Sequence, residues 1–246
     1  MNFTAQDQKI YVAGSNGMVG SAICKLLNKR GFSVKNKNLL VNSKRELDLT
    51  NSKEVDIWFS RNKPDLVILA AAKVGGILAN KNNPVVFLLD NMKIQNNLIE
   101  AAWKFGVKRF LFLGSSCIYP KLSKQPIKEE YLLSDSLEST NQWYALAKIS
   151  GIKLCEAYNK QYDFDAISLM PTNLYGPKDN YNLESGHVMA ALIRKFYEAK
   201  KNNNQNVICW GTGKPLREFL YVDDFAEACL YVCLLYTSPS PRDDIS

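Results

Sequence analysis

Tyr144 and Lys148 are the residues whose types and spacing most clearly suggest chemistry. They lie four positions apart in a segment with a helical pattern, so both side chains project from one face of the helix. A phenol can give a proton to the oxygen of a carbonyl that is being reduced, but its usual pKa of about 10 is high for that work. A cation one turn away favours the phenolate, so we expect Lys148 to lower the pKa of Tyr144.

A second group of polar residues follows residues 109–113, an apolar run that is typical of a buried strand. Ser115, Ser116 and Cys117 come shortly after it, and a serine hydroxyl there could hold the oxygen of a carbonyl substrate. A tyrosine and a lysine at this spacing also occur on ordinary solvated helices. The strand that ends in hydroxyl groups, together with a glycine-rich loop near the N-terminus, favours a hydride-transfer site over that alternative.

The glycine-rich loop lies between a short apolar strand, Lys9–Ala13, and an amphipathic helix that ends near Arg30. Glycines permit a tight turn and let backbone N–H groups approach a pyrophosphate, and the helix N-terminus adds partial positive charge. A glycine-rich turn without a ligand is the alternative, but the flanking strand and helix favour a dinucleotide site. The residues of the loop are Gly14, Ser15, Asn16, Gly17, Met18, Val19 and Gly20.

The second strand, expected over Asn38–Asn42, bears on which dinucleotide would fit. An NAD-binding domain carries an acidic residue near the end of this strand, where it binds the ribose 2′-hydroxyl. This chain has Ser43, Lys44 and Arg45 instead. Cations suit the 2′-phosphate of NADP, so we predict NADP as the cofactor and Lys44 as one of its contacts.

The remaining segments alternate between strand and helix patterns, which predicts an α/β fold with a doubly wound parallel sheet. The continuous apolar run Asp65–Ala72 is typical of a central parallel strand. Long helices are expected over Asn51–Asn62, Pro84–Phe105 and Asn141–Tyr162. Further elements are expected as strands at Asp165–Met170, Asn206–Trp210 and Arg217–Val222, and as helices at His187–Lys201 and Asp223–Tyr231.

Composition narrows the class of protein. The chain has 246 residues and a net charge of +7, but its Lys and Arg residues are dispersed, which favours a small polyanionic ligand over nucleic acid. No apolar run reaches the roughly 18 residues that a membrane span needs, and the polar N-terminus is unlike a secretory signal, so we expect a cytoplasmic protein. The six cysteines are scattered and His187 is the sole histidine, so we expect no metal site.

Four longer motifs carry a resemblance to a known family. They are LGSSCIYP (113–120), YALAKISGIKLCEAYN (144–159), MPTNLYGP (170–177) and PLREFLYVDD (215–224). With the glycine-rich loop, they are similar to the extended short-chain dehydrogenases/reductases. Within that family they resemble the enzymes that epimerise C3 and C5 and reduce C4 of a GDP-linked 4-keto-6-deoxy sugar. The resemblance extends from Lys9 to about Tyr231.

The resemblance implies a Rossmann-type NADP-binding domain over residues 1–175 and part of a smaller substrate domain over residues 176–235. Members of the family continue beyond this point, so it also implies that part of the substrate domain is missing. Residues 236–246 interrupt an amphipathic pattern with serine and proline, and we expect this tail to be non-native. We expect the protein to form a homodimer.

The resemblance also implies roles for individual residues. Tyr144 would donate the proton, Lys148 would activate it and bind the ribose, and Ser115 would hold the carbonyl. Cys117 and His187 would serve epimerisation, since a thiol and an imidazole have usual pKa values of about 8.5 and 6.5. The NADP-binding site would be lined by the glycine-rich loop and by Lys44, Leu113, Gly114, Ser115, Ser116, Lys148, Pro171, Thr172, Asn173, Leu174 and His187. The nucleotide sugar would be held by Lys195, Trp210 and Arg217.

Two alternatives stay open at this level. The protein could be another nucleotide-sugar enzyme, such as a 4,6-dehydratase or a 4-epimerase, but a dehydratase would want an acidic pair where this chain has Cys117 and Ile118. It could also be an NADP-binding sensor without catalysis, which has no need of Tyr144 and Lys148. Lys195 departs from the family, which often has arginine there; lysine keeps the charge but loses the two-pronged hydrogen bonding to a diphosphate.

Overall fold

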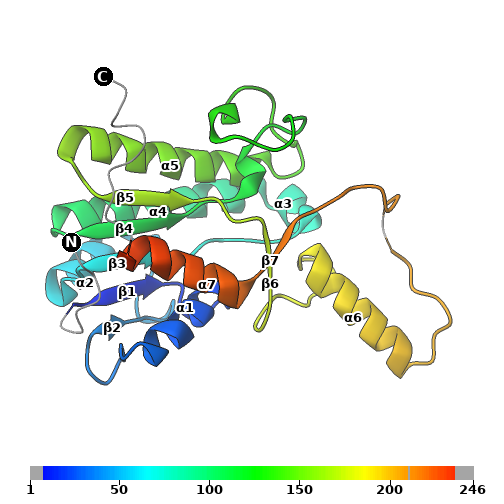
Figure 1. Cartoon of the computed structure of the whole chain (residues 1–246), viewed down its shortest axis with the longest axis horizontal. Helices are drawn as coiled ribbons and strands as arrows, with labels where there is room; N and C mark the ends of the chain where they lie inside the picture. Colours follow the sequence, from blue (N-terminus) through cyan, green and yellow to red (C-terminus); the bar gives the residue numbers. More distant parts are fainter. Residues whose placement is uncertain (1–7, 210, 236–246) are drawn as a thin grey trace.

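The computed structural model describes residues 8–209 and 211–235. Within these residues the centre is a parallel sheet of five strands in the order β2-β1-β3-β4-β5, as Figure 1 shows. Each strand pairs with its neighbours in the parallel sense. The strands span Ile10–Ala13 (β1), Leu39–Leu40 (β2), Leu66–Leu69 (β3), Arg109–Leu113 (β4) and Ala166–Leu169 (β5).

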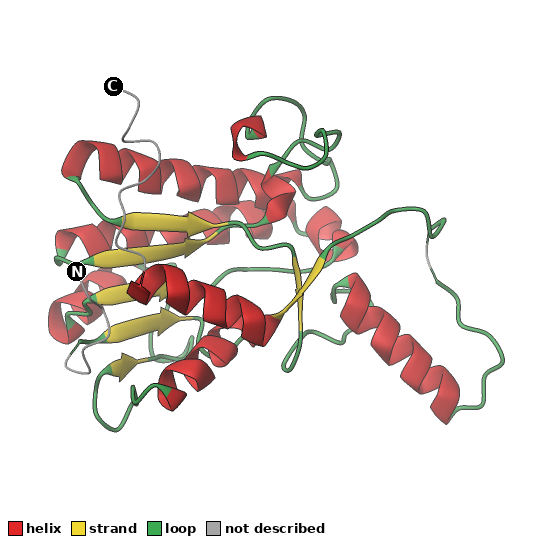
Figure 2. Ribbon diagram, viewed as in Figure 1, coloured by secondary structure: helices red, strands yellow, loops and turns green. Residues whose placement is uncertain are grey.

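Helices cover both faces of the sheet, which confirms the predicted doubly wound architecture (Figure 2). The helices span Met18–Lys29 (α1), Ser52–Asn62 (α2), Ile77–Asn82 (α3), Pro84–Lys104 (α4), Gln142–Tyr162 (α5), Val188–Lys201 (α6) and Val222–Leu230 (α7). α2, α4 and α5 pack on one face, and α1 and α7 pack on the other. Successive strand residues alternate between the faces, so Tyr11 and Val67 join the first core while Val12 and Ile68 join the second.

The long helices begin where local signals predict. Asn51 caps α2, because its side-chain oxygen accepts hydrogen bonds from the backbone N–H groups of Lys53 and Glu54. Pro84 occupies the first turn of α4, where no intrahelical hydrogen bond is lost. The predicted bounds of α4 and α5 are confirmed to within one residue. Among the helices described, none is both long and apolar enough to cross a membrane.

Three features differ from the expectation. No strand forms at residues 206–209, which are mostly exposed, and Trp210 lies outside the described residues. The backbone N–H and C=O groups of a strand need hydrogen-bond partners, which a neighbouring strand provides. The next strand along the chain, residues 219–221, pairs with residues 173–175 and not with residues 206–209. β2 is only two residues long, because only Leu39 and Leu40 pair with β1. Residues 77–82 form the short helix α3, which the sequence analysis does not predict.

The order in which strands are added to the sheet reverses between β1 and β3, and the carboxyl ends of these two strands mark that point. From β1 the chain moves outward to β2 and then crosses back, so that β3 lies on the other side of β1. In open parallel sheets, ligands bind in the crevice outside such a point. The glycine-rich loop follows β1 and residues 73–76 follow β3, so both lie at this crevice.

A smaller parallel pair joins β6 (Asn173–Tyr175) to β7 (Phe219–Tyr221). Between these strands, α6 and its loops stand away from the sheet, as Figure 1 shows. α7 then returns to the sheet and packs on α1, where an ion pair of 2.7 Å joins Lys25 to Asp223. The division of the chain at residue 175 stays a prediction, and the tail 236–246 lies outside the described residues.

Candidate active site

The glycine-rich loop is a tight turn that has no room for side chains at two positions. Gly14 has a φ of +86°, and a Cβ atom there would lie 2.6 Å from the backbone nitrogen of Ala71. A Cβ atom on Gly20 would lie 2.2 Å from the carbonyl oxygen of Gly14. Both positions therefore need glycine if the turn is to lie against the end of β3.

The N-terminus of α1 is open to an anionic ligand. Gly17 is its N-cap residue and provides no side-chain hydrogen bond, and the first turn of α1 carries no acidic residue. A Cβ atom on Gly17 would meet only the Gly14 oxygen within 4 Å, at an ordinary contact distance of 3.5 Å. The first N–H groups of the helix are thus available to phosphate oxygens, which fits the pyrophosphate of a dinucleotide.

We expect Gly20→Ala to lower the free energy of unfolding by about 1–3 kcal/mol, the usual range for overpacking. The added methyl group would overlap the backbone of Gly14, which cannot yield unless the turn opens. Gly17→Ala is the matched control, because its methyl group would make only an ordinary contact. Urea unfolding measures both variants, and equal stabilities would show that the turn has more room than these distances indicate.

A second turn presents two cations at the end of β2. Glu46 Oε2 accepts a hydrogen bond from the Ser43 N–H at 2.6 Å, which is one half of a capping box. The Ser43 carbonyl oxygen in turn accepts from the Glu46 N–H at 3.1 Å. Lys44 and Arg45 occupy the middle of the turn and are exposed. The turn therefore carries both cations on the surface.

Lys148 is buried beneath the carboxyl end of β4. The residue is 4% exposed, and its Nζ donates a hydrogen bond to the Leu113 carbonyl oxygen at 2.7 Å. The Nζ atom lies 4.9 Å from the ring centroid of Phe112 and 5.7 Å from that of Tyr144. Burial lowers the pKa of Lys148 to about 8, while the nearby Cys117 raises it. The lysine is therefore fixed beside the tyrosine ring.

The pKa of Tyr144 shifts in the opposite direction to the expectation. Burial of the phenol is the largest cause of the raised pKa, and the neighbouring Cys117 raises it further. The expected lowering by Lys148 is wrong in this structure, because loss of solvation outweighs a cation whose hydrogen bond goes to Leu113. Tyr144 therefore holds its proton at neutral pH, as a proton donor must.

Cys117 belongs to the same group of side chains. Its backbone N–H donates to the Ser115 hydroxyl at 3.4 Å, in the short helical turn Ser116–Ile118 that follows β4. Burial raises the pKa of the Cys117 thiol, whereas a Ser115 hydrogen bond and the Lys148 charge lower it. The turn that carries Cys117 packs against α5, so a thiol, a phenol and an ammonium group lie in the same part of the site.

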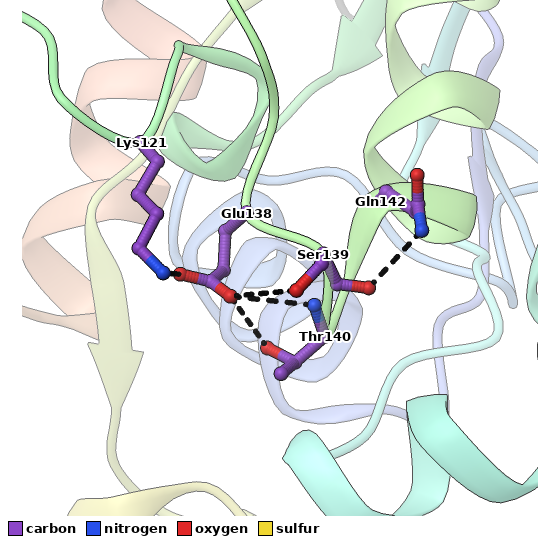
Figure 3. A network of polar contacts seen from close by, with 5 residues as sticks. All are labelled: Lys121, Glu138, Ser139, Thr140 and Gln142. Carbon is purple, nitrogen blue, oxygen red and sulfur yellow. Dashed lines mark hydrogen bonds and ion pairs between the residues drawn. The ribbon is translucent and has the colours of Figure 1, made fainter.

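The long loop from β4 to α5 is fastened just before the helix begins. Figure 3 shows Lys121 paired with Glu138 at 2.8 Å, while Glu138 also accepts hydrogen bonds from the N–H and hydroxyl groups of Thr140. The hydrogen bond with Lys121 is the main reason that the pKa of Glu138 lies below its usual value. The Gln142 amide donates to the Ser139 carbonyl oxygen at the first turn of α5. This network fixes where the helix that carries the tyrosine starts.

The segments after β4 and β5 are joined at the same edge of the sheet. The Ser116 N–H donates to the Pro171 carbonyl oxygen at 3.1 Å, and the Gly114 N–H donates to the Leu169 carbonyl oxygen at 2.8 Å. The structure thus brings together two of the stretches that are predicted to line NADP. The Asn173 side chain is less available to a cofactor, because its amide donates a hydrogen bond to the Glu218 carbonyl oxygen, just before β7.

Comparison with known proteins places this site in a family. The profile of the NAD dependent epimerase/dehydratase family matches residues 10–244. The chain belongs to this family. It is 56% identical to GDP-L-fucose synthase 1 of Arabidopsis thaliana over 229 residues, which cover 93% of this chain and 70% of that protein. It is 52% identical to GDP-L-fucose synthase of Escherichia coli (strain K12) over 225 residues, which cover 92% of this chain and 69% of that protein.

Solved structures agree with the family. The chain is similar to a GDP-L-fucose synthetase from Naegleria fowleri bound to NADP, with a TM-score of 0.84 and 33% identity. That likeness covers 98% of this chain and 79% of the other. MlghC, a GDP-mannoheptose C4 reductase from Campylobacter jejuni with NADP bound, gives a TM-score of 0.83 at 36% identity, over 93% of this chain and 75% of the other. These findings confirm the resemblance and the fold that the sequence motifs predict.

Gln95, to which the sequence analysis assigns no role, supports the helix that carries Tyr144 and Lys148. It is 2% exposed on α4, and its amide donates to the Ala147 carbonyl oxygen of α5 at 2.7 Å. A Cβ atom on Gly151 would lie 2.4 Å from the Phe112 ring and 2.9 Å from the Gln95 side chain, so α4, α5 and β4 meet without a gap. The signal in the sequence is a polar residue among the apolar positions of the α4 segment.

Of the residues predicted to bind the nucleotide sugar, Lys195 lies on α6 and Arg217 lies in the segment between α6 and β7. Lys195 donates from its Nζ to the Ile208 carbonyl oxygen at 3.0 Å, and Arg217 is exposed. Trp210 lies outside the described residues. His187 is the exposed N-cap residue of α6. In the described part of the chain, no hydrogen bond or ion pair joins His187 or Arg217 to the tyrosine, lysine and cysteine group.

Proposed function

We propose that the protein is a GDP-L-fucose synthase, which epimerises C3 and C5 of GDP-4-keto-6-deoxymannose and reduces C4 with NADPH. The observation that carries the proposal is the packing of the turn that holds Cys117 against α5, where Tyr144 and Lys148 adjoin. A reductase needs a proton donor and a cation, and an epimerase needs in addition an acid–base group near the carbons that flank the carbonyl. The relatives in Arabidopsis thaliana and Escherichia coli, each more than half identical to the chain, are named for this activity.

For reduction, side chains at the end of β4 and on α5 hold and protonate the carbonyl oxygen. NADPH bound against the glycine-rich loop supplies the hydride. The Ser115 hydroxyl holds the C4 oxygen, and Tyr144, whose buried phenol keeps its proton, gives that proton to the oxygen as negative charge develops. Lys148 lies beside the ring, and its charge stabilises the phenolate that is left.

For epimerisation, the C4 ketone acidifies the protons at C3 and C5. Cys117 and His187 form the acid–base pair, in which one group removes a proton and the other supplies one from the opposite face of the sugar. Burial keeps most of Cys117 as thiol, so proton removal by it depends on the thiolate fraction that Ser115 and Lys148 support. His187 comes from a separate segment, at the start of α6.

Residues 176–235 form part of a substrate domain in this proposal, and residues 1–175 form the NADP-binding domain. The position of α6, which stands away from the sheet, supports this division. Lys195, Trp210 and Arg217 bind the GDP moiety, with the two cations facing its diphosphate. Lys195 offers a point charge and not a planar fork, so we assign it a charge contact rather than a paired hydrogen bond.

The deciding experiment mixes the full-length gene product with NADPH and GDP-4-keto-6-deoxymannose and identifies the product by NMR. GDP-L-fucose is the expected product. A product with only the C4 centre changed would favour another nucleotide-sugar enzyme of the family. NADPH binding without turnover would favour a non-catalytic NADP-binding protein.

Lys44 and Arg45 bind the 2′-phosphate of NADP in this proposal, so the protein should prefer NADPH to NADH. Replacing both residues by serine should reduce the preference roughly tenfold or more, because a hydrogen bond to a charged group contributes about 1.5–3 kcal/mol. Lys35→Ser is the matched control, since Lys35 is also exposed but precedes β2 at its opposite end. The ratio of kcat/KM for the two cofactors measures the effect, and a ratio near one in the parent would refute the assignment.

The protein forms a homodimer through α4 and α5 in this proposal. These helices pack side by side, and they leave Val85, Leu89, Trp143 and Leu146 between 38% and 67% exposed. Burial of such apolar area is favourable when two copies meet. Sedimentation over a range of concentrations tests this, and a monomer at every concentration would contradict it.

The partner is a small nucleotide sugar and not a nucleic acid, and the proposed compartment is the cytoplasm. All six cysteines are free, as is usual in a reducing compartment. Filter binding with DNA and RNA tests the first statement, and cell fractionation tests the second. Tight, salt-resistant binding of either polymer, or recovery in a secreted fraction, would contradict them.

A further inference from the structure

Two segments that are far apart in the sequence meet at the carboxyl end of β3. One is residues 73–76, here called the β3 loop, and the other is residues 180–186, here called the α6 entry segment. The Gly76 N–H donates a hydrogen bond to the Ser185 carbonyl oxygen at 2.9 Å. A Cβ atom on Gly76 would lie 2.5 Å from the carbonyl oxygen of Gly186. The two backbones are therefore in direct contact, one residue before His187.

The β3 loop is held by two buried asparagines. Asn91 of α4 accepts from the Lys73 N–H at 2.7 Å and donates to the Lys73 carbonyl oxygen at 3.0 Å. Asn80 of α3 donates to the carbonyl oxygens of Gly75 and Gly76, at 2.7 and 3.2 Å. Asn91 is 2% exposed and Asn80 is 4% exposed. Because buried polar groups are costly to leave unpaired, these hydrogen bonds fix the path of the loop.

The α6 entry segment is fixed by hydrogen bonds of its own. The Asn182 side-chain oxygen accepts from the N–H groups of Glu184 and Ser185, at 2.9 and 3.0 Å. The Gly186 N–H donates to the Asn182 carbonyl oxygen at 2.8 Å. His187 follows, and its side chain makes no hydrogen bond within the described part of the chain. The place of His187 is therefore set by the backbone on which it is carried and not by a bond of its imidazole.

We propose that Asn80, Asn91 and Gly76 are positioning residues for His187, acting through the contact between the β3 loop and the α6 entry segment. The inference rests on the proposed function, in which His187 is one of the two acid–base groups. Such a group must lie within hydrogen-bond reach of the proton that it transfers. A displacement of about 1 Å, caused far from the reacting atoms, can cost about 10²-fold in rate.

The test compares Asn80→Ala with Asn83→Ala. Asn83 follows α3 directly and also donates its amide to a backbone carbonyl oxygen, but that oxygen belongs to Ala79 and not to the β3 loop. The readout is the incorporation of solvent deuterium at C3 and C5 of GDP-4-keto-6-deoxymannose without NADPH. Calorimetric binding of 2′,5′-ADP reports whether the NADP-binding domain is folded. We expect exchange to fall roughly tenfold or more in Asn80→Ala protein with KM little changed, and to stay at the parent rate in Asn83→Ala protein.

A double-mutant cycle separates positioning from general damage. If Asn80 acts through His187, then Asn80→Ala should barely change the residual exchange of His187→Ala protein. Gly76→Ala is a second variant, because its methyl group would push against Gly186 and should reproduce the loss. An equal fold-loss from Asn80→Ala with and without His187, or parent-like exchange in both loop variants, would overturn the inference. Lack of exchange in the parent protein would count instead against the proposed function.

Discussion

Tyr144→Phe protein should bind NADPH normally but oxidise it, in the presence of the keto sugar, about 10²–10⁴-fold more slowly than the parent. The ring remains, so packing beside Lys148 is kept, while the proposed proton donor is lost. Burial holds the proton on the Tyr144 phenol. The Lys148 Nζ is bonded to the Leu113 carbonyl oxygen at 2.7 Å and is not placed to replace the hydroxyl. Stopped-flow fluorescence gives the rate, and fluorescence titration gives the affinity for NADPH.

Tyr158→Phe is the matched control for this prediction. Tyr158 lies on the same helix, about 21 Å farther along its axis, where its ring packs against Trp103 and Phe164. Burial is also the largest cause of the raised pKa of Tyr158, and the two variants differ in where the lost hydroxyl lies along α5. We expect NADPH oxidation close to the parent rate in this variant. A similar rate in Tyr144→Phe protein would exclude Tyr144 as the proton donor.

The spacing of Tyr144 and Lys148 predicts that the two side chains adjoin, because positions four apart on a helix share a face. It does not predict the direction of the pKa shift of Tyr144. That direction depends on how far the assembled fold removes the phenol from solvent, and on Cys117, which comes from the turn after β4. Sequence spacing reports neighbours on one helix, whereas burial is a property of the assembled fold.

The difference between local sequence signals and contacts of the assembled fold also explains which elements could be predicted. β3 is a continuous apolar run, and so is β4 after Arg109. Such runs indicate from consecutive residues alone that both faces of the strand are buried. The strand expected at residues 206–210 needed a partner from another part of the chain. The structure pairs β7 with β6 instead, and residues 206–209 have no regular structure.

Polar residues that support the site show what the sequence leaves open. Gln95 binds the carbonyl oxygen of Ala147, which is 52 positions away, and Asn91 binds the backbone of Lys73, which is 18 positions away. A polar residue in an apolar pattern signals that a partner exists, because a buried amide needs one. It does not say which backbone group the partner is, since that follows from how α4 lies against α5 and β3.

Cys117→Ser should separate epimerisation from reduction. In the proposed mechanism reduction at C4 uses Tyr144, Lys148 and Ser115, and all three remain in this variant. Epimerisation needs an acid and a base but no hydride. Serine keeps the size of cysteine, and its backbone N–H can still donate to the Ser115 hydroxyl. The serine hydroxyl, however, has a pKa far above the working pH, so the proposed base is lost.

The variant should therefore still oxidise NADPH slowly, yet release a 6-deoxy sugar that is unepimerised or only partly epimerised. The incorporation of solvent deuterium at C3 and C5 should fall by about 10²–10⁴-fold, the usual contribution of a general acid or base. NMR of the product formed in D₂O measures both its stereochemistry and its deuterium content.

Cys155→Ser is the matched control, because Cys155 is also a free thiol, on α5, and burial raises its pKa to about 12. If loss of a buried sulfur were harmful only through packing, the two variants would lose activity together. If Cys117 transfers protons, exchange should fall in Cys117→Ser protein alone. Exchange at the parent rate in Cys117→Ser protein would make Cys117 a structural cysteine and would require another residue, paired with His187, to remove the proton.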